Sequence, residues 1–238
     1  MNEADPTEII QLDYFSDILC VWSYIAQVRV DELREKLGNK ISISYHYINI
    51  FGCTENRIKN GWKDRGGYAG FGQHVIEACK PYPHIVVHPD IWKTNQPVSS
   101  ASCHLFLKAL QNLEATGELA DQSTKNAGVH TTFEKFCWLL RCTFFRDNRN
   151  IGLFSTLYEL AESMQFPIGK IEQQIANGNA FAALCADSEL QDSKKIEGSP
   201  TFLLNQGRQK LFGNVGYRII EANIEELLQR PKDMASWC

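Results

Sequence analysis

The stretch DYFSDILCVWSYIA, residues 13 to 26, changes its pattern at Cys20. Before this cysteine, IIQLDYF (residues 9 to 15) is an apolar run rich in β-forming residues, which predicts a strand. After it, apolar residues recur at helical spacing as far as Gly38, a common helix stop. The recurring positions are Trp22, Ala26, Val30, Leu33 and Leu37. The stretch therefore predicts a strand and a helix joined by a short turn, with Cys20 at the junction.

A second strand is expected over residues 41 to 48, ISISYHYI. Its residues alternate strictly, which places Ile41, Ile43, Tyr45 and Tyr47 on one face. A strand, a helix and a strand in this order form a β-α-β unit, whose two strands run parallel with a right-handed crossover. The first fifty residues are predicted to form such a unit.

The middle of the chain changes character twice. Residues 52 to 98 are rich in glycine, proline and aromatic residues and show no sustained period, which indicates a loop-rich cap. From Ser99 to about Gln191 the apolar spacing is helical, which predicts a block of several helices.

The end of the chain returns to strands after Gly198. The runs TFLLN and QKLFG read as strands joined by a short polar turn, and a closing helix follows that stops at Pro231. The two half-sheets are expected to pair in one mixed sheet. The predicted domains are residues 1 to 52 and 192 to 238, which share the sheet, and the cap and helical block of residues 53 to 191 inserted between them.

Cys20 is the candidate nucleophile. A thiol reacts as the thiolate, and a helix N-terminus favours that anion through free N–H groups and the positive end of the helix dipole. Such a position can lower the pKa of a cysteine from about 8.5 to between roughly 3.5 and 7.5. Ser23, one turn into the helix, could donate its hydroxyl to the thiolate but cannot form a disulfide with it. The alternative is that Cys20 is a small apolar residue at a strand-helix junction.

A proline stands directly before the third predicted strand, in IEGSPTF (residues 196 to 202). Proline is tolerated there only at the first residue of a strand or on an edge. A cis Ser199–Pro200 bond would explain it and would leave the Ser199 backbone free to pair with an extended thiol ligand beside Cys20. The alternative is an ordinary trans-proline entering an edge strand.

Composition excludes several classes of protein. The chain has 238 residues, 44% of them hydrophobic, which suffices for a substantial core. Its 24 basic and 28 acidic residues give a net charge of −4 without a basic run, which argues against a nucleic-acid partner. No apolar run approaches the ~18 residues of a membrane span, and the N-terminus lacks the pattern of a secretory signal. We therefore expect a cytoplasmic protein, without a membrane partner, whose eight cysteines are mostly reduced core thiols.

The segments DYFSDILCVWSYIA, GSPTFLLN and LFGNVGYRIIEANIEELL together resemble the DsbA-like branch of the thioredoxin superfamily. Within it the chain is similar, over nearly its whole length, to the subgroup of FrnE-type oxidoreductases, 2-hydroxychromene-2-carboxylate isomerases and kappa-class glutathione transferases. The resemblance implies an α/β thioredoxin-like fold with a large inserted helical domain. It also implies glutathione as co-substrate and no covalently bound cofactor. Transferase members are commonly dimers, so a homodimer is an open expectation.

The resemblance also implies roles for individual residues. Cys20 matches the nucleophilic cysteine of the oxidoreductases, or the serine that hydrogen-bonds the glutathione thiol in transferases and isomerases. Ser23 falls where the oxidoreductases keep a resolving cysteine. Pro200 matches the family's cis-proline, and Ser199 the residue whose backbone meets the cysteinyl part of glutathione.

Further binding residues are less closely matched. Asn214 and Val215 fall near a Ser-Asp or Ala-Asp pair that holds the γ-glutamyl group in glutathione-binding members, but the acidic residue is missing here. Trp22 is expected to border the substrate. It could line a cleft together with other aromatic residues, although such residues also fill cores. These residues are Trp62, Tyr68 and Trp92.

Other cysteines and histidines give weaker signals. Cys53, in the loop after the second strand, is the candidate resolving thiol, and its alternative is a free loop thiol without a partner. Cys137 and Cys142 are five apart on a helical pattern and are expected in the core. His84 and His88 are spaced like metal ligands, but no third ligand is evident nearby, and no metal is expected.

Three functions remain open from the sequence. The first is a thiol-disulfide oxidoreductase with a monothiol Cys-x-x-Ser site, in which Cys20 attacks a glutathionyl or protein disulfide and an external thiol resolves the intermediate. The second is a glutathione-dependent transferase or isomerase in which Cys20 orients the glutathione thiol. The third is a non-catalytic thioredoxin-fold module that keeps the groove for a partner.

Overall fold

A four-stranded mixed sheet forms the centre of the protein. The computed structural model describes residues 9–119 and 130–228. The strands are β1 (Ile10–Ser16), β2 (Ile41–Tyr47), β3 (Thr201–Leu204) and β4 (Gln209–Phe212), in the order β2-β1-β3-β4. β1 runs parallel to β2 and antiparallel to β3, and β4 is antiparallel to β3. The predicted β-α-β unit, the pairing of the two half-sheets and the α/β fold class are therefore confirmed.

Helix α1 (Val21–Leu37) begins directly after Cys20 and connects β1 to β2. It ends at Gly38, whose φ of 49° lies in the left-handed region that favours glycine. Helix α8 (Tyr217–Leu228) packs against the sheet through buried Ile220 and Ile224, in a cluster that includes Leu12 of β1. Pro231, the expected stop of this helix, lies outside the described residues.

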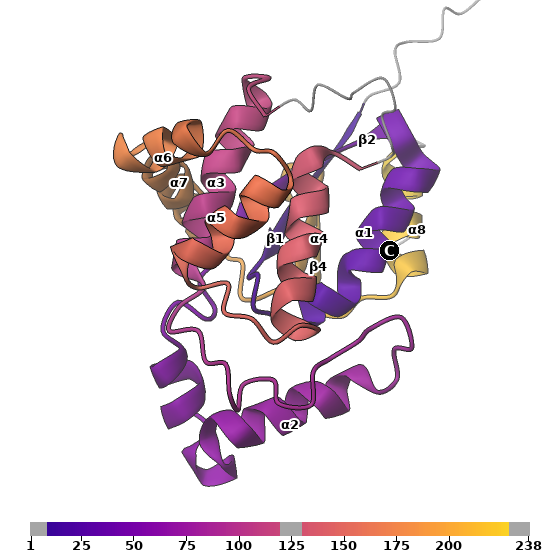
Figure 1. Cartoon of the computed structure of the whole chain (residues 1–238). Coiled ribbons are helices and arrows are strands. Elements are labelled where there is room, and N and C mark those ends of the chain that lie inside the picture. Colours follow the sequence, from indigo (N-terminus) through magenta and orange to yellow (C-terminus); the bar gives the residue numbers. More distant parts are fainter. Residues whose placement is uncertain (1–8, 120–129, 229–238) are drawn as a thin grey trace, which may run out of the picture.

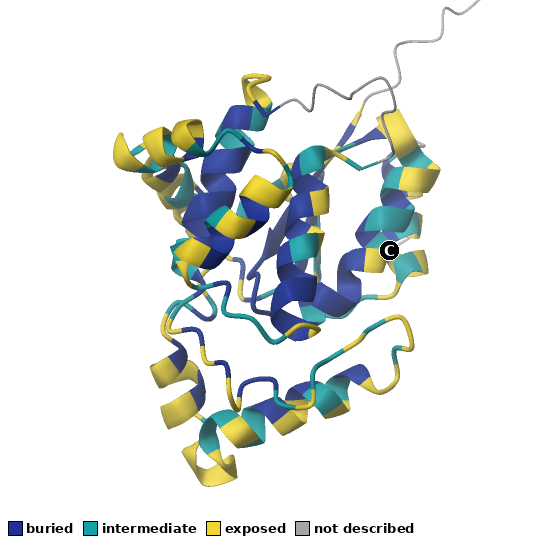
Figure 2. Ribbon diagram, viewed as in Figure 1, coloured by how far each residue is buried: buried dark blue, intermediate teal, exposed yellow. Residues whose placement is uncertain are grey.

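The helices between β2 and β3 form most of the remaining core (Figure 1). They are α2 (Gly67–Cys79), α3 (Ala101–Ala115), α4 (Thr132–Phe145), α5 (Phe154–Ser163), α6 (Ile168–Ala176) and α7 (Asn179–Ser193). A capping box fixes the start of α4, because the Thr131 hydroxyl accepts from the Glu134 N–H while the Glu134 carboxylate accepts from the Thr131 N–H. Figure 2 shows that α3 and α4 are largely buried, whereas α6 is mostly exposed.

The outer edge of β2 is covered by side chains from this helical block. The amide of Gln111 on α3 donates to the carbonyl of Tyr45, and the N–H of Tyr47 donates to the carboxylate of Asp187 on α7. An edge strand with unpaired backbone groups is a template for aggregation, and covering it removes that hazard.

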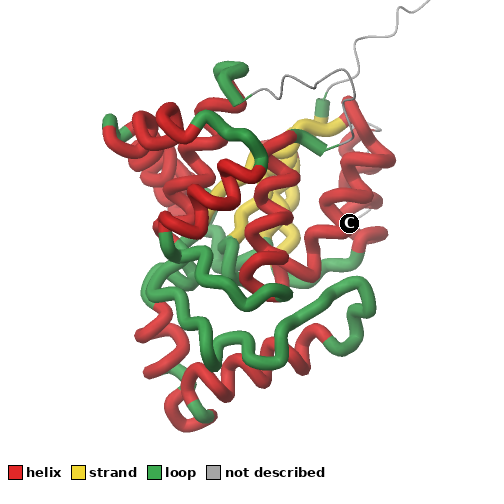
Figure 3. Tube along the Cα trace, viewed as in Figure 1, coloured by secondary structure: helices red, strands yellow, loops and turns green. Residues whose placement is uncertain are grey.

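The loop-rich cap predicted for residues 52 to 98 contains more helix than expected. A π-helical turn over residues 55 to 60 and helix α2 lie in this segment, which extends below the rest of the molecule in Figures 1 and 3. Two glycines of α2 explain the missed helix, because close packing requires them. A Cβ atom on Gly70 would lie 1.6 Å from the carbonyl oxygen of Arg65, and one on Gly72 would lie 2.1 Å from that of Ile91.

Candidate active site

Cys20 is the N-cap residue of α1. Its backbone is extended (φ −79°, ψ 118°), and its carbonyl accepts the first helical hydrogen bonds, from the N–H groups of Ser23 and Tyr24. The thiol is therefore at the positive end of the helix dipole, beside N–H groups without helical partners. Cys20 is only 6% exposed, and it lines the cavity described below.

The turn before β3 meets this helix start. The Ser199–Pro200 peptide bond is cis, Pro200 is buried, and the thiol of Cys20 donates to the carbonyl oxygen of Ser199 at 3.3 Å. The structure thus brings together two segments that lie 179 positions apart in the chain. This carbonyl is an acceptor beside the sulfur, where a ligand with a free N–H group could also bind.

Ser23 contacts the same turn and not the thiol. Its hydroxyl oxygen lies 2.8 Å from that of Ser199, which also accepts from the N–H of Asp17 at 2.9 Å. Ser23 is fully buried. The expected hydrogen bond from the Ser23 hydroxyl to the Cys20 thiol is therefore not among the described hydrogen bonds. The Ser23 hydroxyl is paired with the Ser199 hydroxyl instead.

The buried carboxylate of Asp17 stabilises the loop that carries Cys20. Asp17 is fully buried, and its side chain accepts from the N–H groups of Leu19 and Phe51 and from the hydroxyl of Ser100. These three charge-assisted bonds satisfy the carboxylate and fix the turn between β1 and α1. Sequence reasoning missed this role, although an aspartate within the apolar stretch DILCVW was a visible signal.

His104 of α3 supports the same loop. Its Nε2 accepts from the N–H of Ile18 at 3.1 Å, so its Nδ1 carries the proton and donates to the side chain of Asn49 at 2.9 Å. The ring is fully buried and stacks on Tyr47. Nothing in the local sequence marks this histidine, because its partners lie 55 and 86 positions away.

A cavity of about 600 Å³ opens beside Cys20. This volume is typical of small-molecule sites. Its lining residues come from α1, from the turn before β3 and from the segment around α2. Five of the described lining residues are Phe or Trp, and the charged ones are two arginines and one glutamate. The aromatic residues are Trp22, Phe51, Trp62, Phe71 and Phe212, and the charged ones are Arg57, Arg65 and Glu197.

Several sequence-predicted binding residues lie outside this lining. Asn214 accepts a hydrogen bond from Arg29 and donates one to the hydroxyl of Tyr82, and Val215 packs against the core between α8 and the sheet. Neither residue is among those that line the cavity, and the γ-glutamyl contact expected at these positions stays a prediction. Of the predicted aromatic residues, Trp22 and Trp62 line the cavity, whereas Trp92 is fully buried and stacks on Tyr68.

All seven cysteines in the described ranges are free thiols, and Cys238 lies outside them. Cys53 is exposed and is not among the residues that line the cavity. Cys137 and Cys142 are buried, as the helical pattern predicts. Burial raises the pKa of Cys137 to about 12 and that of Cys79 to about 11, which keeps both protonated at neutral pH.

His84 and His88, which are spaced in the sequence like metal ligands, make other contacts. His84 lies near the carbonyl of Ile25, and His88 accepts from the N–H of Asp90. Within residues 9–119 and 130–228, no group of three or more His, Cys, Asp or Glu side chains is arranged to hold a metal ion. Nor does any described helix have the length and apolarity needed to cross a membrane.

No protein-family model matches this chain, and no curated protein matches it in sequence. Solved structures match its fold. A probable DsbA oxidoreductase from Streptomyces coelicolor has a TM-score of 0.69 at 15% identity, over 94% of this chain and 92% of that one. The 2-hydroxychromene-2-carboxylate isomerase has a TM-score of 0.60 at 15% identity, over 95% of this chain and 100% of that one.

A third structure in this group was solved with glutathione (GSH). It is the cytosolic disulfide reductase DsbM from Pseudomonas aeruginosa, with a TM-score of 0.62 at 16% identity, over 92% of this chain and 99% of that one. The fold is therefore the DsbA-like thioredoxin fold. The resemblance found in the sequence is confirmed at the level of the fold, and both its oxidoreductase and its isomerase members are among the structural neighbours.

Proposed function

We propose that this protein is a monothiol thiol-disulfide oxidoreductase with Cys20 as its nucleophile. The observation that carries the proposal is the position of the Cys20 thiol, which lies at the start of α1, 3.3 Å from the carbonyl of Ser199 and at the edge of a cavity of about 600 Å³. The thiol there faces the positive end of the helix dipole and N–H groups without helical partners. The cavity gives a small disulfide access to it.

The reaction has two exchange steps. The thiolate of Cys20 attacks one sulfur of a glutathionyl disulfide, forms a mixed disulfide with glutathione, and releases the other half as a thiolate that takes up a proton. A second glutathione, as its thiolate, then attacks the glutathione sulfur of the mixed disulfide. Oxidised glutathione leaves, and Cys20 regains its thiol. The net reaction consumes one glutathione from solution, which leaves as oxidised glutathione together with the glutathionyl half of the substrate, while the other half of the substrate is released as a thiol.

Ser23 makes the second glutathione necessary. A hydroxyl cannot attack a disulfide, so the position one helical turn from Cys20 cannot resolve the intermediate. Cys53 stays a candidate resolving thiol. It does not line the cavity, so resolution by Cys53 requires this residue to move toward Cys20. The proposal includes a cytoplasmic setting, in which free thiols persist and to which the cytosolic disulfide reductase DsbM also belongs.

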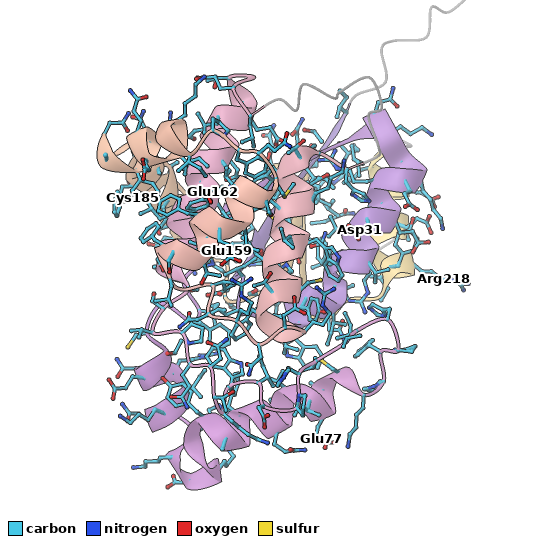
Figure 4. All side chains as sticks on the ribbon, viewed as in Figure 1. Asp31, Glu77, Glu159, Glu162, Cys185 and Arg218 are labelled. Carbon is cyan, nitrogen blue, oxygen red and sulfur yellow. The ribbon has the colours of Figure 1, made fainter. Side chains whose placement is uncertain are left out.

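Turnover of a glutathionylated peptide by glutathione tests the proposal. The Cys20→Ser variant is expected to lose at least about a hundredfold in rate, because serine is not a nucleophile toward sulfur. Cys185→Ser is the matched control, since this exposed cysteine on α7 lies at the opposite side of the molecule from α1 in Figure 4. Iodoacetamide at neutral pH should also label Cys20 faster than Cys185. Equal turnover by wild type and Cys20→Ser would refute the nucleophilic role.

One observation favours a second function, a glutathione-dependent transferase or isomerase. The sulfur of Cys20 acts as a donor to the Ser199 carbonyl, and a serine hydroxyl would make the same bond. In that case Cys20 orients the thiol of bound glutathione and does not break bonds itself. Cys20→Ser would then keep activity in a glutathione conjugation or isomerisation assay, while Cys20→Ala would lose it.

A further inference from the structure

The wall of the cavity carries two positive charges that are unpaired within the described residues. Arg57 lies in the π-helical turn over residues 55 to 60, and Arg65 follows it in a short 3-10 helix over residues 63 to 65. Neither guanidinium makes an ion pair or a side-chain hydrogen bond within the described residues. Their neighbour Lys59, by contrast, is paired with Glu55 at 2.7 Å. π-Helical turns are often found at functional sites.

Arg65 is held in place by an aromatic stack. Its guanidinium carbon lies 3.7 Å from the centre of the Trp62 ring, and the edge of that ring packs on Phe71 at a centroid distance of 5.1 Å. Stacking on an indole uses the face of the guanidinium and leaves the N–H groups on its rim for a ligand. A planar fork of donors held in this way suits a carboxylate.

The charge balance of the cavity favours an anion. Among the described lining residues Glu197 is the single carboxylate, and it precedes Gly198 and Ser199 in the chain. Arg57 and Arg65 line the same cavity, and Arg65 lies over the Trp62 ring, with the His74 ring 5.0 Å from that indole. The guanidinium groups thus outnumber the carboxylate in the described lining.

We propose that Arg57 and Arg65 select small acidic disulfides as substrates, with a carboxylate bound to the two guanidinium groups and the carbon skeleton against Trp62 and Phe71. This inference rests on the proposed oxidoreductase function and names the substrate class of the same site. Cys20 attacks the sulfur that reaches its end of the cavity, the sulfur–sulfur bond breaks, and the acidic half leaves as a thiolate or stays as the mixed disulfide. A protein disulfide without nearby acidic groups would gain nothing from this wall.

A matched pair of probes tests the selection. Dithiobis(nitrobenzoate) is an aromatic disulfide with two carboxylates, and its diamide has the same size without charge. Each releases a coloured thiolate, so kcat and KM can be measured for both with glutathione as the reductant. The ratio of kcat/KM for the dianion to that for the diamide, corrected for the uncatalysed reactions, should exceed ten for the wild type, because charge-assisted hydrogen bonds are worth roughly that factor or more.

The double variant Arg57→Gln, Arg65→Gln should lower this ratio about tenfold, with most of the change in KM for the dianion. Arg65→Lys should lower it by less, since it keeps the charge and loses the planar fork. Arg218→Gln, on the exposed face of α8 in Figure 4, is the matched control and should keep the wild-type ratio. The preference should also weaken as salt is added.

The outcomes separate this inference from the function on which it rests. If both probes are turned over with a kcat/KM ratio near one, the proposed selection of acidic disulfides is wrong. The same holds if the double variant leaves this ratio unchanged. Either result leaves the oxidoreductase function unaffected. If neither probe is turned over and Cys20 resists iodoacetamide, the oxidoreductase function fails and the substrate class fails with it.

Discussion

The hydroxyl oxygens of Ser23 and Ser199 lie 2.8 Å apart and join the first turn of α1 to the turn before β3, across 176 positions of the chain. Ser199 also accepts from the N–H of Asp17, and its carbonyl accepts from the thiol of Cys20. Ser23 falls where the oxidoreductases that the chain resembles keep a resolving cysteine. Through its bond to Ser199, it helps to hold the Ser199 carbonyl beside the sulfur of Cys20.

Removal of the Ser23 hydroxyl should weaken this junction. We expect Ser23→Ala to lower the free energy of unfolding by about 1 to 2 kcal/mol, because the partly buried hydroxyl of Ser199 loses a partner. Urea unfolding of Ser23→Ala, Ser199→Ala and the double variant gives the coupling between the two sites, which should be at least about 0.5 kcal/mol. Strictly additive effects would show that the two hydroxyls do not support each other.

Replacing Ser23 by cysteine should change the mechanism. Residues three apart on a helix are neighbours, at a separation that a disulfide can span. With oxidised glutathione, the Ser23→Cys variant is therefore expected to form an internal disulfide with Cys20, whereas the wild type accumulates the glutathione adduct. Intact-mass spectrometry after acid quenching distinguishes the two products. A persistent glutathione adduct on Ser23→Cys would mean that the buried position of residue 23 prevents attack.

A charged cluster outside the cavity should make stability depend on pH. His46 lies between Asp13 and Asp187, at 3.1 and 2.8 Å, and Lys108 also binds Asp187. Burial alone would lower the pKa of His46, but the hydrogen bonds to Asp13 and Asp187 outweigh burial and raise the pKa above 6.5. Burial would likewise raise the pKa of Asp187, but His46 and Lys108 lower it, so that Asp187 stays ionised in the weakly acidic range.

The sign of the pH effect follows from these directions. Because the pKa of His46 is higher in the folded state, its stabilisation is complete below the unfolded value of about 6.5 and is lost as the pH rises through the folded value. His46→Gln should therefore lower the free energy of unfolding more at about pH 5.5 than at about pH 8.5. Urea unfolding at both values checks this, with His84→Gln, an exposed histidine, as control. An equal loss at both values would contradict the ion-pair role.

The strands and the first helix could be predicted from the sequence, because each leaves a local pattern, whereas the meeting of Cys20 with Ser199 was implied by the family resemblance of the two segments. Alternation marks β2, the helical spacing ends at Gly38, and a proline stands before β3. The partner of Ser23 and the support from His104 could not be predicted, because hydrogen bonds between distant residues leave no period. The two hydrogen bonds of the Asn214 side chain could not be predicted for the same reason, since its partners Arg29 and Tyr82 belong to other segments.

Helix α2 was missed because its glycines read as a loop, and this gives the last prediction. Glycine weakens a helix by about 1 kcal/mol relative to alanine, so an exposed helical glycine is normally improved by alanine. Gly169 of α6 is such a position, since a Cβ there meets nothing within 4 Å. We expect Gly169→Ala to raise the free energy of unfolding by about 0.5 to 1 kcal/mol.

Gly70→Ala should do the opposite, because its Cβ would lie 1.6 Å from the Arg65 carbonyl oxygen and the backbone would have to move. We expect a loss of about 2 kcal/mol or more in urea unfolding, typical of overpacked sites. Displacement of this turn would also shift Arg65 and Trp62, so the preference for the acidic probe should fall together with stability. If Gly70→Ala behaves like Gly169→Ala, then α2 does not pack on the turn at residues 63 to 65 as described, and the wall proposed to select acidic substrates loses its support.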